Sequence, residues 1–174
     1  MPLFPAKASD LPAIADLVNS AYRGDSSRQG WATEADIIGG QRTDPESLRS
    51  DLEAQPDARL LMYRDTADGE LLGCVWLEPY GEAAWYLGLL TVRPDLQDRR
   101  LGRTLLEAAE GAVRDLGGRT IRMTVVQLRE TLIAWYERRG YRLTGETAPF
   151  PYGDLRFGEP LRDDLHFVVL AKTL

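Results

Sequence analysis

The most informative part of this 174-residue sequence is VRPDLQDRRLGRTLL, residues 92–106. An apolar, strand-like segment over 83–92 leads into it, and a helical pattern over 102–116 follows. Arg99, Arg100 and Arg103 lie in the turn between the two. The first backbone N–H groups of a helix lack intrahelical partners and attract anions, so we expect this turn to bind a phosphate group. The same local pattern also fits an ordinary strand-to-helix turn with solvated arginines.

The segments on either side of this turn alternate between strand-like and helix-like periodicity. Period-two segments predict strands over 4–8, 59–65, 70–78, 83–92, 119–126, 141–145 and 165–171, and helical periodicity predicts helices over 9–22, 43–53, 102–116 and 130–139. We therefore expect a single domain over residues 1–174, of the α/β (α+β) class, in which a mixed sheet is covered by helices. Two long loops, over 25–41 and 148–162, are expected to border the site.

Composition excludes several classes of function. The net charge of −6 opposes the binding of nucleic acid. The start of the chain lacks the pattern of a signal peptide and no segment is long enough to cross a bilayer, so we expect a cytoplasmic protein without a membrane partner. One cysteine, Cys74, and one histidine, His166, cannot assemble the usual zinc ligand sets, so no metal is expected. Cys74 lies in an apolar segment and is interpreted as a packing residue.

Three segments together resemble the GNAT superfamily of N-acetyltransferases. The family's pyrophosphate loop follows the pattern (Gln or Arg)-x-x-Gly-x-(Gly or Ala), and residues 97–102 match its first and last positions, with Arg100 at the central glycine. Residues 89–94 resemble the strand before that loop, and residues 134–141 resemble the helix ending (Leu or hydrophobic)-Tyr-x-x-x-Gly-(Phe or Tyr). The order and spacing of the three segments agree, and the likeness covers nearly the whole chain.

The resemblance implies a fold and a reaction. The fold is a mixed, mostly antiparallel sheet of about seven strands flanked by about four helices. The reaction is transfer of an acetyl group from acetyl-CoA, the co-substrate, to a primary amine of a small molecule or protein, directly within a ternary complex. A homodimer is one option for the assembly. The main alternative is a non-catalytic CoA-binding or sensing domain on the same fold. A P-loop nucleotide site would need a lysine followed by serine or threonine, which the turn lacks.

The resemblance also implies which residues contact the cofactor. A bulge in the strand turns the backbone N–H of Leu90 toward the thioester carbonyl, and Val92 pairs with the pantetheine arm. Arg100 would crowd the phosphate if its φ must be positive. Arg129 stands where the family often has an asparagine; because arginine cannot accept a hydrogen bond, it either pairs with a CoA phosphate or is solvated. The full set is Leu90, Val92, Gln97, Asp98, Arg99, Arg100, Leu101, Gly102, Arg103, Thr104 and Arg129.

Tyr136 matches the family tyrosine that protonates the departing CoA thiolate. A tyrosine with a pKa of about 10 is still protonated at neutral pH and can donate a proton to a thiolate whose conjugate thiol has a pKa near about 8.5. A role as a plain core aromatic beside Trp135 is the alternative.

The acceptor side is less well defined by the sequence. Some family members use a carboxylate on the strand that corresponds to 83–92, but this segment contains none, and Tyr86 stands about where it would be. Glu34, Asp36 and Glu82 are candidate bases or binders of a cationic amine, or plain surface carboxylates. Aromatic residues in the two long loops are candidate walls. The proposed acceptor-binding residues are Trp31, Glu34, Tyr86, Phe150 and Tyr152.

Overall fold

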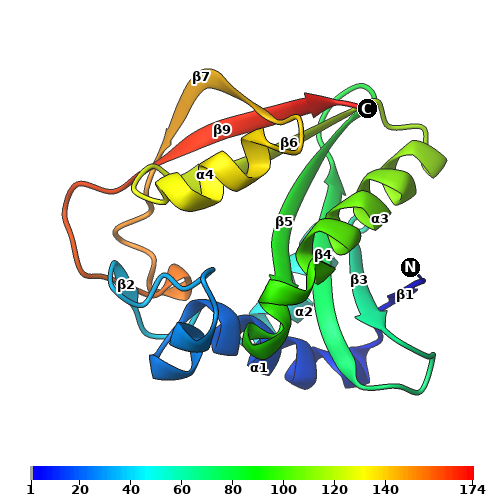
Figure 1. Cartoon of the computed structure of the whole chain (residues 1–174), viewed down its shortest axis with the longest axis horizontal. Coiled ribbons are helices and arrows are strands. Elements are labelled where there is room, and N and C mark those ends of the chain that lie inside the picture. The colour runs from blue at the N-terminus through cyan, green and yellow to red at the C-terminus, as the bar shows by residue number, and fades with distance from the viewer. Residues whose placement is uncertain (1) are drawn as a thin grey trace.

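The computed structural model describes residues 2–174, without the side chains of Asp25, Asp98 and Arg99. A seven-stranded sheet has the order β1-β3-β4-β5-β6-β9-β7, and a two-stranded sheet joins β2 and β8 (Figure 1). The strands are β1 (Leu3–Pro5), β2 (Ile38–Gly39), β3 (Arg59–Arg64), β4 (Leu71–Pro79), β5 (Ala84–Val92), β6 (Thr120–Val126), β7 (Arg142–Pro149), β8 (Glu159–Pro160) and β9 (His166–Thr173). The α-helices are α1 (Leu11–Tyr22), α2 (Pro45–Ala54), α3 (Leu101–Asp115) and α4 (Glu130–Glu137). This architecture confirms the fold expected from the sequence.

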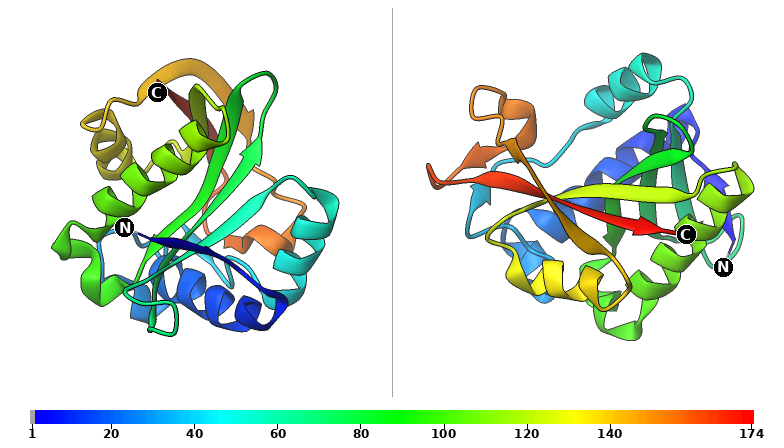
Figure 2. Two further views of the ribbon diagram at one scale, coloured as in Figure 1. Left: turned by 90° about the vertical axis from the view of Figure 1, so that its right-hand side faces the viewer. Right: turned by 90° about the horizontal axis from the view of Figure 1, so that it is seen from above.

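Helices cover both faces of the large sheet, as the two further views show (Figure 2). Successive side chains of a strand point to opposite faces, and β4 illustrates how this divides the core. Cys74 and Trp76 pack with the apolar side chains of α1 and α2, whereas Val75 and Leu77 pack with those of α3. A strand with both faces buried is apolar at every position, which explains the continuous hydrophobic run of β4.

The centre of the sheet holds a parallel pair that separates along its length. β5 and β6 pair in parallel over Ala84–Tyr86 and Thr120–Arg122, whereas the other pairs within the large sheet are antiparallel. Beyond this junction the two strands diverge, and Figure 1 shows the opening between them. α4 lies beside the diverging part of β6, and α1 lies at the open end. The sheet therefore leaves backbone of β5 and β6 unpaired on facing edges.

β5 contains a bulge at the level of this opening. The register between β4 and β5 shifts so that Leu89 and Leu90 of β5 lie opposite Val75 of β4. Leu89 has a φ of 50°, a left-handed backbone conformation that a leucine rarely adopts. The bulge expected from the family resemblance is therefore present, and such irregularities often lie next to sites because they redirect backbone groups.

The two long loops contain structure that the sequence pattern does not predict. The loop over 25–41 begins with a 3-10 turn at Asp25–Gln29 and pairs through β2 with β8, which lies in the loop over 148–162. Ile38, Val126, Phe150 and Leu165 form a small buried cluster beneath them. Strands of two residues are too short to show a period, so only the tertiary structure reveals this pairing.

Within residues 2–174, no helix combines the length and the apolar composition that crossing a lipid bilayer would require.

Candidate active site

Two neighbouring cavities open where β5 and β6 diverge. The first cavity has a volume of about 210 Å³ and the second about 70 Å³. Tyr22, Leu90, Leu132 and Tyr136 line both cavities, so the cavities meet at the β5 bulge. A site with two compartments that meet at one point can bring two molecules together there.

The second cavity lies against the turn before α3. A 3-10 turn at Pro94–Arg99 leads to Arg100, and α3 begins at Leu101. The first intrahelical bond of α3 runs from the Thr104 N–H to the Arg100 carbonyl at 3.1 Å, so the N–H groups of residues 101–103 have no intrahelical partner. Arg100, Gly102 and Arg103 line the second cavity. This helix start has the geometry and the charge for binding an anion.

Arg100 occupies a conformation that suits glycine. Its φ of 61° and ψ of 9° place it in the left-handed region, which costs an L-residue about 1–2 kcal/mol. Gly102 is in an open position instead: a Cβ added there would meet only the Trp135 ring within 4 Å, at an ordinary 3.5 Å. Packing within the chain therefore does not require glycine at position 102. A glycine there leaves the backbone open to a close approach by a ligand.

Gln97 fastens the loop over 25–41 to the end of β5. Its Nε2 donates to the Val92 carbonyl at 3.2 Å, and its Oε1 accepts from the Ala32 N–H at 3.2 Å. The Arg93 N–H donates to the Leu72 carbonyl of β4. Successive residues of a strand point their backbone N–H and C=O groups to opposite edges, so the backbone groups of Val92 face the opening between β5 and β6. The Val92 carbonyl is thus already occupied by a side chain of the same cavity.

Aromatic residues and an arginine close the other side of the second cavity. Trp31 packs on Trp135 with ring centroids 5.7 Å apart, and the Arg139 guanidinium stacks 3.9 Å from the centre of the Trp135 ring. The Nη1 of Arg139 donates to the Trp135 carbonyl at 2.7 Å. Trp31, expected at the acceptor side, therefore lines the second cavity and not the first.

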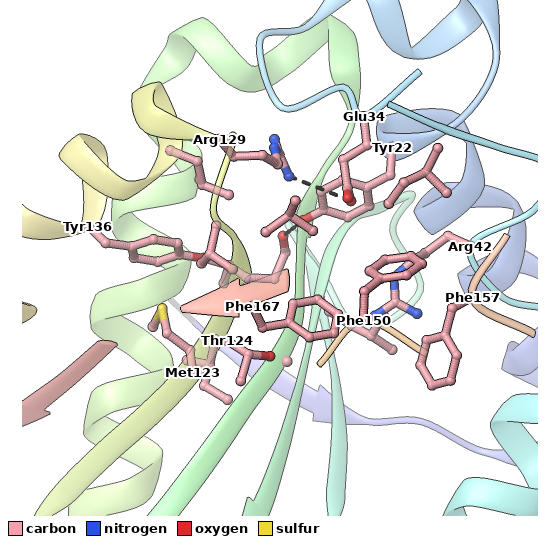
Figure 3. A pocket seen from close by; sticks show the side chains of 18 of the residues that line it. Tyr22, Glu34, Arg42, Met123, Thr124, Arg129, Tyr136, Phe150, Phe157 and Phe167 are labelled. Atoms are coloured by element: carbon pink, nitrogen blue, oxygen red, sulfur yellow. Dashed lines mark hydrogen bonds and ion pairs between the residues drawn. The ribbon is translucent and has the colours of Figure 1, made fainter. Parts of the chain in front are cut away.

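The first cavity combines aromatic walls with charged residues (Figure 3). Of the expected acceptor residues, Glu34, Tyr86 and Phe150 line it. Tyr152 does not: it packs behind Phe150 at 5.1 Å between ring centroids, and its hydroxyl accepts from the Leu165 N–H. The remaining lining residues come from several segments of the chain, and they include Tyr22, Arg23, Ile38, Arg42, Met123, Thr124, Arg129, Phe157 and Phe167.

A charge network joins the walls of the first cavity. Glu34 Oε1 lies 3.2 Å from Arg23 Nη1 and 3.6 Å from Arg129 Nη1, and Figure 3 shows its contact with Arg129. Arg129 also donates to the Ala32 carbonyl at 2.6 Å. The exposed fractions of the Arg23, Arg129 and Glu34 side chains are 4%, 9% and 11%. Arg129 thus contacts the loop over 25–41. This differs from both expected alternatives, which were a contact with a CoA phosphate and a solvated side chain.

Tyr136 reaches from α4 to the point where the cavities meet (Figure 3). Its side chain is buried, and no hydrogen bond involves its hydroxyl within residues 2–174. Burial raises its pKa above the ordinary value for tyrosine, and the nearby Tyr22 adds to the effect. The group therefore stays protonated at any physiological pH and keeps a free donor at this point.

Tyr22 holds the bulge from the other side. Its hydroxyl, at the end of α1, donates to the Leu90 carbonyl. Leu90 therefore has its carbonyl fixed, and Leu90 itself lines both cavities.

The other residues singled out in the sequence lie around the site or away from it. The side chains of Asp98 and Arg99 lie outside the described part of the structure. Leu101 packs against the core, and Thr104 is exposed with its hydroxyl donating to the Arg100 carbonyl. Asp36 is exposed and pairs with Arg28, and Glu82 is exposed in the turn between β4 and β5, so neither lines these cavities.

Several lining residues are absent from the sequence-based expectations. Tyr22 and Arg23 end α1 and read as part of an amphipathic helix, and Arg42 reads as an ordinary loop residue. Phe157 and Phe167 come from segments distant in sequence. No pattern of neighbouring residues identifies them in the sequence, because they are related only by lying around the same cavity in the folded chain.

The sequence matches the model of the acetyltransferase (GNAT) family over residues 13–141. A search of curated proteins finds no match. Solved structures share the fold at low sequence identity. A ribosomal-protein-alanine N-acetyltransferase from Brucella melitensis is 19% identical, with a TM-score of 0.69 and 100% of each chain covered. A GNAT family acetyltransferase from Elizabethkingia anophelis with acetyl-CoA bound is 16% identical, with a TM-score of 0.69, over 99% of this chain and 97% of that chain.

A variant of the spermidine N-acetyltransferase from Vibrio cholerae has the same fold, with 17% identity and a TM-score of 0.67 over 99% of this chain and 95% of that chain. Because the family model spans most of the chain and the fold agrees over nearly its whole length, the protein belongs to the GNAT family of acetyltransferases.

Proposed function

We propose that this acetyltransferase uses acetyl-CoA and transfers the acetyl group to a primary amine by direct transfer within a ternary complex. The observation that carries the proposal is the junction of the two cavities at Leu90 and Tyr136. Two molecules bound from opposite sides would meet there, and holding reactants together in this way can lower the barrier of a transfer reaction. The amine could belong to a small molecule or to a protein.

We assign the second cavity to the co-substrate. The N–H groups at the start of α3 and the nearby Arg100 and Arg103 would hold a pyrophosphate. The open position of Gly102 leaves the backbone accessible. The backbone groups of Val92 face the opening and would pair with the extended pantetheine arm of the co-substrate. That arm would have to displace the Gln97 side chain from the Val92 carbonyl. Acetyl-CoA supplies the activated acetyl group as a thioester.

Two groups of this chain act where the bonds change. The backbone N–H of Leu90, a residue of the bulge, would polarise the thioester carbonyl of acetyl-CoA, whose oxygen gains negative charge during the transfer. The amine nitrogen bonds to the acetyl carbon, the carbon–sulphur bond breaks, and the Tyr136 hydroxyl gives its proton to the sulphur. The proton that the amine loses restores the Tyr136 hydroxyl through solvent. Its raised pKa keeps Tyr136 in the donor form that this step needs.

Glu34 is a weaker candidate for a general base than its position suggests. It is the carboxylate that lines the first cavity, but it lies within 3.6 Å of two arginine guanidinium groups. Its Oε1 is engaged by these guanidinium groups and is not free to face an incoming amine. This arrangement supports a role in fixing the arginines, and we assign no general base.

Release of free thiol from acetyl-CoA across a panel of primary amines tests the proposal, with the acetylated amine identified by mass spectrometry. We expect turnover that requires the amine. The alternative, a CoA-binding domain without catalysis, is favoured by the unusual Arg100 and by the occupied Val92 carbonyl. Tight binding of CoA in calorimetry, with no turnover on any amine, would establish the alternative and reject the enzyme.

A further inference from the structure

The charged residues of the first cavity carry an excess of positive charge. Arg23, Arg42 and Arg129 line it, with Glu34 as the one carboxylate among the described lining residues. Three positive charges and one negative charge leave a formal excess of two. The whole chain carries a net charge of −6, so the sign of the cavity is opposite to that of the molecule. Such a local field attracts an anion into a site on an acidic protein.

Arg42 contributes charge that no described carboxylate balances. Glu34 pairs with Arg23 and Arg129 but not with Arg42, and no carboxylate among the described side chains forms an ion pair with Arg42. Its guanidinium carbon lies 6.0 Å from the centre of the Phe157 ring, and the residue is half-buried. In Figure 3 it lies across the cavity from Tyr136. The cation is thus held beside an aromatic ring at the end of the cavity away from the expected reaction point.

Arg23 adds a buried positive charge to the wall of the first cavity. It is buried, and its Nη2 donates to the Phe157 carbonyl at 3.0 Å. Its Nη1 contacts Glu34 as an ion pair, yet neither Nη1 nor Nε makes a hydrogen bond of good geometry with the described residues. Arg23 is thus held in place by Glu34 and by the Phe157 carbonyl, and what it adds to the cavity is positive charge.

The rest of the cavity wall is apolar. Ile38, Phe150, Phe157 and Phe167 line it, and its volume of about 210 Å³ is small for a ligand pocket, which more often has about 300–1,000 Å³. The part of an acceptor that enters this cavity is therefore small, and it meets apolar surface as well as positive charge.

We propose that the first cavity selects a small amine that also carries an oxyanion, with the size and partly apolar character of an amino acid. This inference rests on the proposed function, because it names the acceptor of the same site. The oxyanion lies toward Arg42, where a guanidinium can form two parallel hydrogen bonds to it, and the amine lies toward Leu90 and Tyr136. A polyamine would bring additional positive charge next to the arginines and is disfavoured.

One set of amines with a common skeleton tests the inference. L-phenylalanine carries a carboxylate, 1-amino-2-phenylethylphosphonate carries a phosphonate, and 2-phenylethylamine carries neither; spermidine serves as the polycation. We expect kcat/KM for at least one of the two anionic amines to exceed that for 2-phenylethylamine tenfold or more, and the better of the two identifies the oxyanion. Equal values for the three amines, or a preference for spermidine, would overturn the inference.

Variants of Arg42 show whether this residue is responsible. Arg42→Met should reduce the ratio of kcat/KM between the anionic and the neutral amine at least tenfold, and Arg42→Lys should keep part of it. General damage to the fold would lower both values in proportion and leave the ratio unchanged. Arg49→Met is the matched control, because Arg49 lies exposed on α2 in a pair with Glu46. An unchanged ratio in Arg42→Met would reject its role.

A binding measurement separates failure of the inference from failure of the proposed function. Calorimetry compares N-acetyl-L-phenylalanine, N-acetyl-1-amino-2-phenylethylphosphonate and N-acetyl-2-phenylethylamine as ligands of the full chain in the presence of CoA. We expect at least one anionic product to bind at least tenfold more tightly than the neutral one. If no amine turns over but this preference holds, transfer is wrong and the anion site stands. If amines turn over without any such preference in rate or binding, transfer stands and the anion site is rejected.

Discussion

The first and second cavities meet at the same bulge but are built in different ways. The anion-binding side of the second cavity depends on backbone: a helix start, an unusual φ at Arg100 and the edge of β5. The first cavity depends on side chains, above all the arginines around Glu34. Backbone geometry tolerates changes of sequence, whereas a charge network does not. In the proposed reaction, binding of acetyl-CoA would therefore rest largely on backbone geometry, whereas the choice of acceptor would rest on side chains.

The largest expected effect of one substitution comes from the charge network of the first cavity. Glu34→Gln leaves Arg23 and Arg129 buried without a counter-charge, and we expect the free energy of unfolding to fall by about 3–5 kcal/mol, the usual effect of breaking a buried ion pair. Urea denaturation measures it. Glu46→Gln removes an exposed partner of Arg49 and should cost about 0.5 kcal/mol or less. A loss below about 1 kcal/mol in Glu34→Gln would show that the first cavity does not depend on its charges.

The next effect concerns the point that the two cavities share. Tyr136→Phe should lower kcat about 100-fold, because it removes the proton donor, while KM for acetyl-CoA stays nearly constant. Steady-state kinetics at saturating amine measures both values. Tyr80→Phe is the control, since Tyr80 is exposed at the far end of β4. An unchanged kcat in Tyr136→Phe would remove the acid role.

The pH dependence adds a second test of Tyr136. Burial disfavours the phenolate and raises the pKa of Tyr136 above its ordinary value, so the donor form persists where an exposed tyrosine would begin to ionise. We expect kcat of the native protein to show no alkaline decline from this group up to about pH 10, the ordinary pKa of tyrosine. A decline that is present in the native protein and absent in Tyr136→Phe would contradict the raised pKa.

The strained turn of the second cavity should give a smaller effect. Arg100→Gly removes the cost of the left-handed conformation, and we expect the free energy of unfolding to rise by up to about 1 kcal/mol. Affinity for acetyl-CoA, measured by calorimetry, should stay equal or become tighter, because a Cβ no longer crowds the turn. A tenfold weaker affinity would instead show that the Arg100 side chain contacts a phosphate.

Gly102→Ala provides the opposite change at the same turn. The new methyl group meets the Trp135 ring at an ordinary contact distance, so the fold should tolerate it. The added Cβ faces the second cavity, and acetyl-CoA should bind more weakly. Equal affinity in the presence of the methyl group would show that the ligand does not approach the backbone at residue 102.

The smallest expected effect involves Cys74, which lies on β4 behind the bulge. Its Sγ is 3.6 Å from the Leu89 carbonyl, and burial raises the pKa of the Cys74 thiol to about 12. At pH 8 the thiolate fraction is therefore about one in ten thousand. A thiol reagent should not label Cys74 in the native protein, with or without acetyl-CoA, but should label it in urea. Labelling of the native protein would show that the packing around Cys74, behind the bulge of β5, opens to solvent.

Most of the fold could be predicted from the sequence, and so could the position of the turn before α3. The helix expected over 43–53 is present as Pro45–Ala54, where the Asp44 side chain accepts from the Ser47 N–H, and the positive φ of Gly140 after α4 suits a glycine. The turn before α3 is contiguous in sequence, so its role as an anion site can be proposed from local chemistry. Local rules suffice where neighbouring residues make the structure.

The first cavity could not be predicted in the same way. Arg23 and Arg42 flank the loop over 25–41, and Phe157 and Phe167 come from the far end of the chain. The pairing of β2 with β8 brings these segments together, and each of these strands is only two residues long. Their association depends on long-range packing, and no periodicity of the sequence reports it. The placement of Trp31 in the second cavity has the same cause.

The short junction between β5 and β6 has a consequence for the cooperativity of the fold. Three residue pairs join the half-sheet of β1, β3, β4 and β5 to the half-sheet of β6, β9 and β7. Amide hydrogens in the two halves should therefore exchange with solvent as separate units, with different opening free energies. A molecule that binds to both β5 and β6 would couple these units. Its binding should then slow the exchange of amide hydrogens in both halves of the sheet.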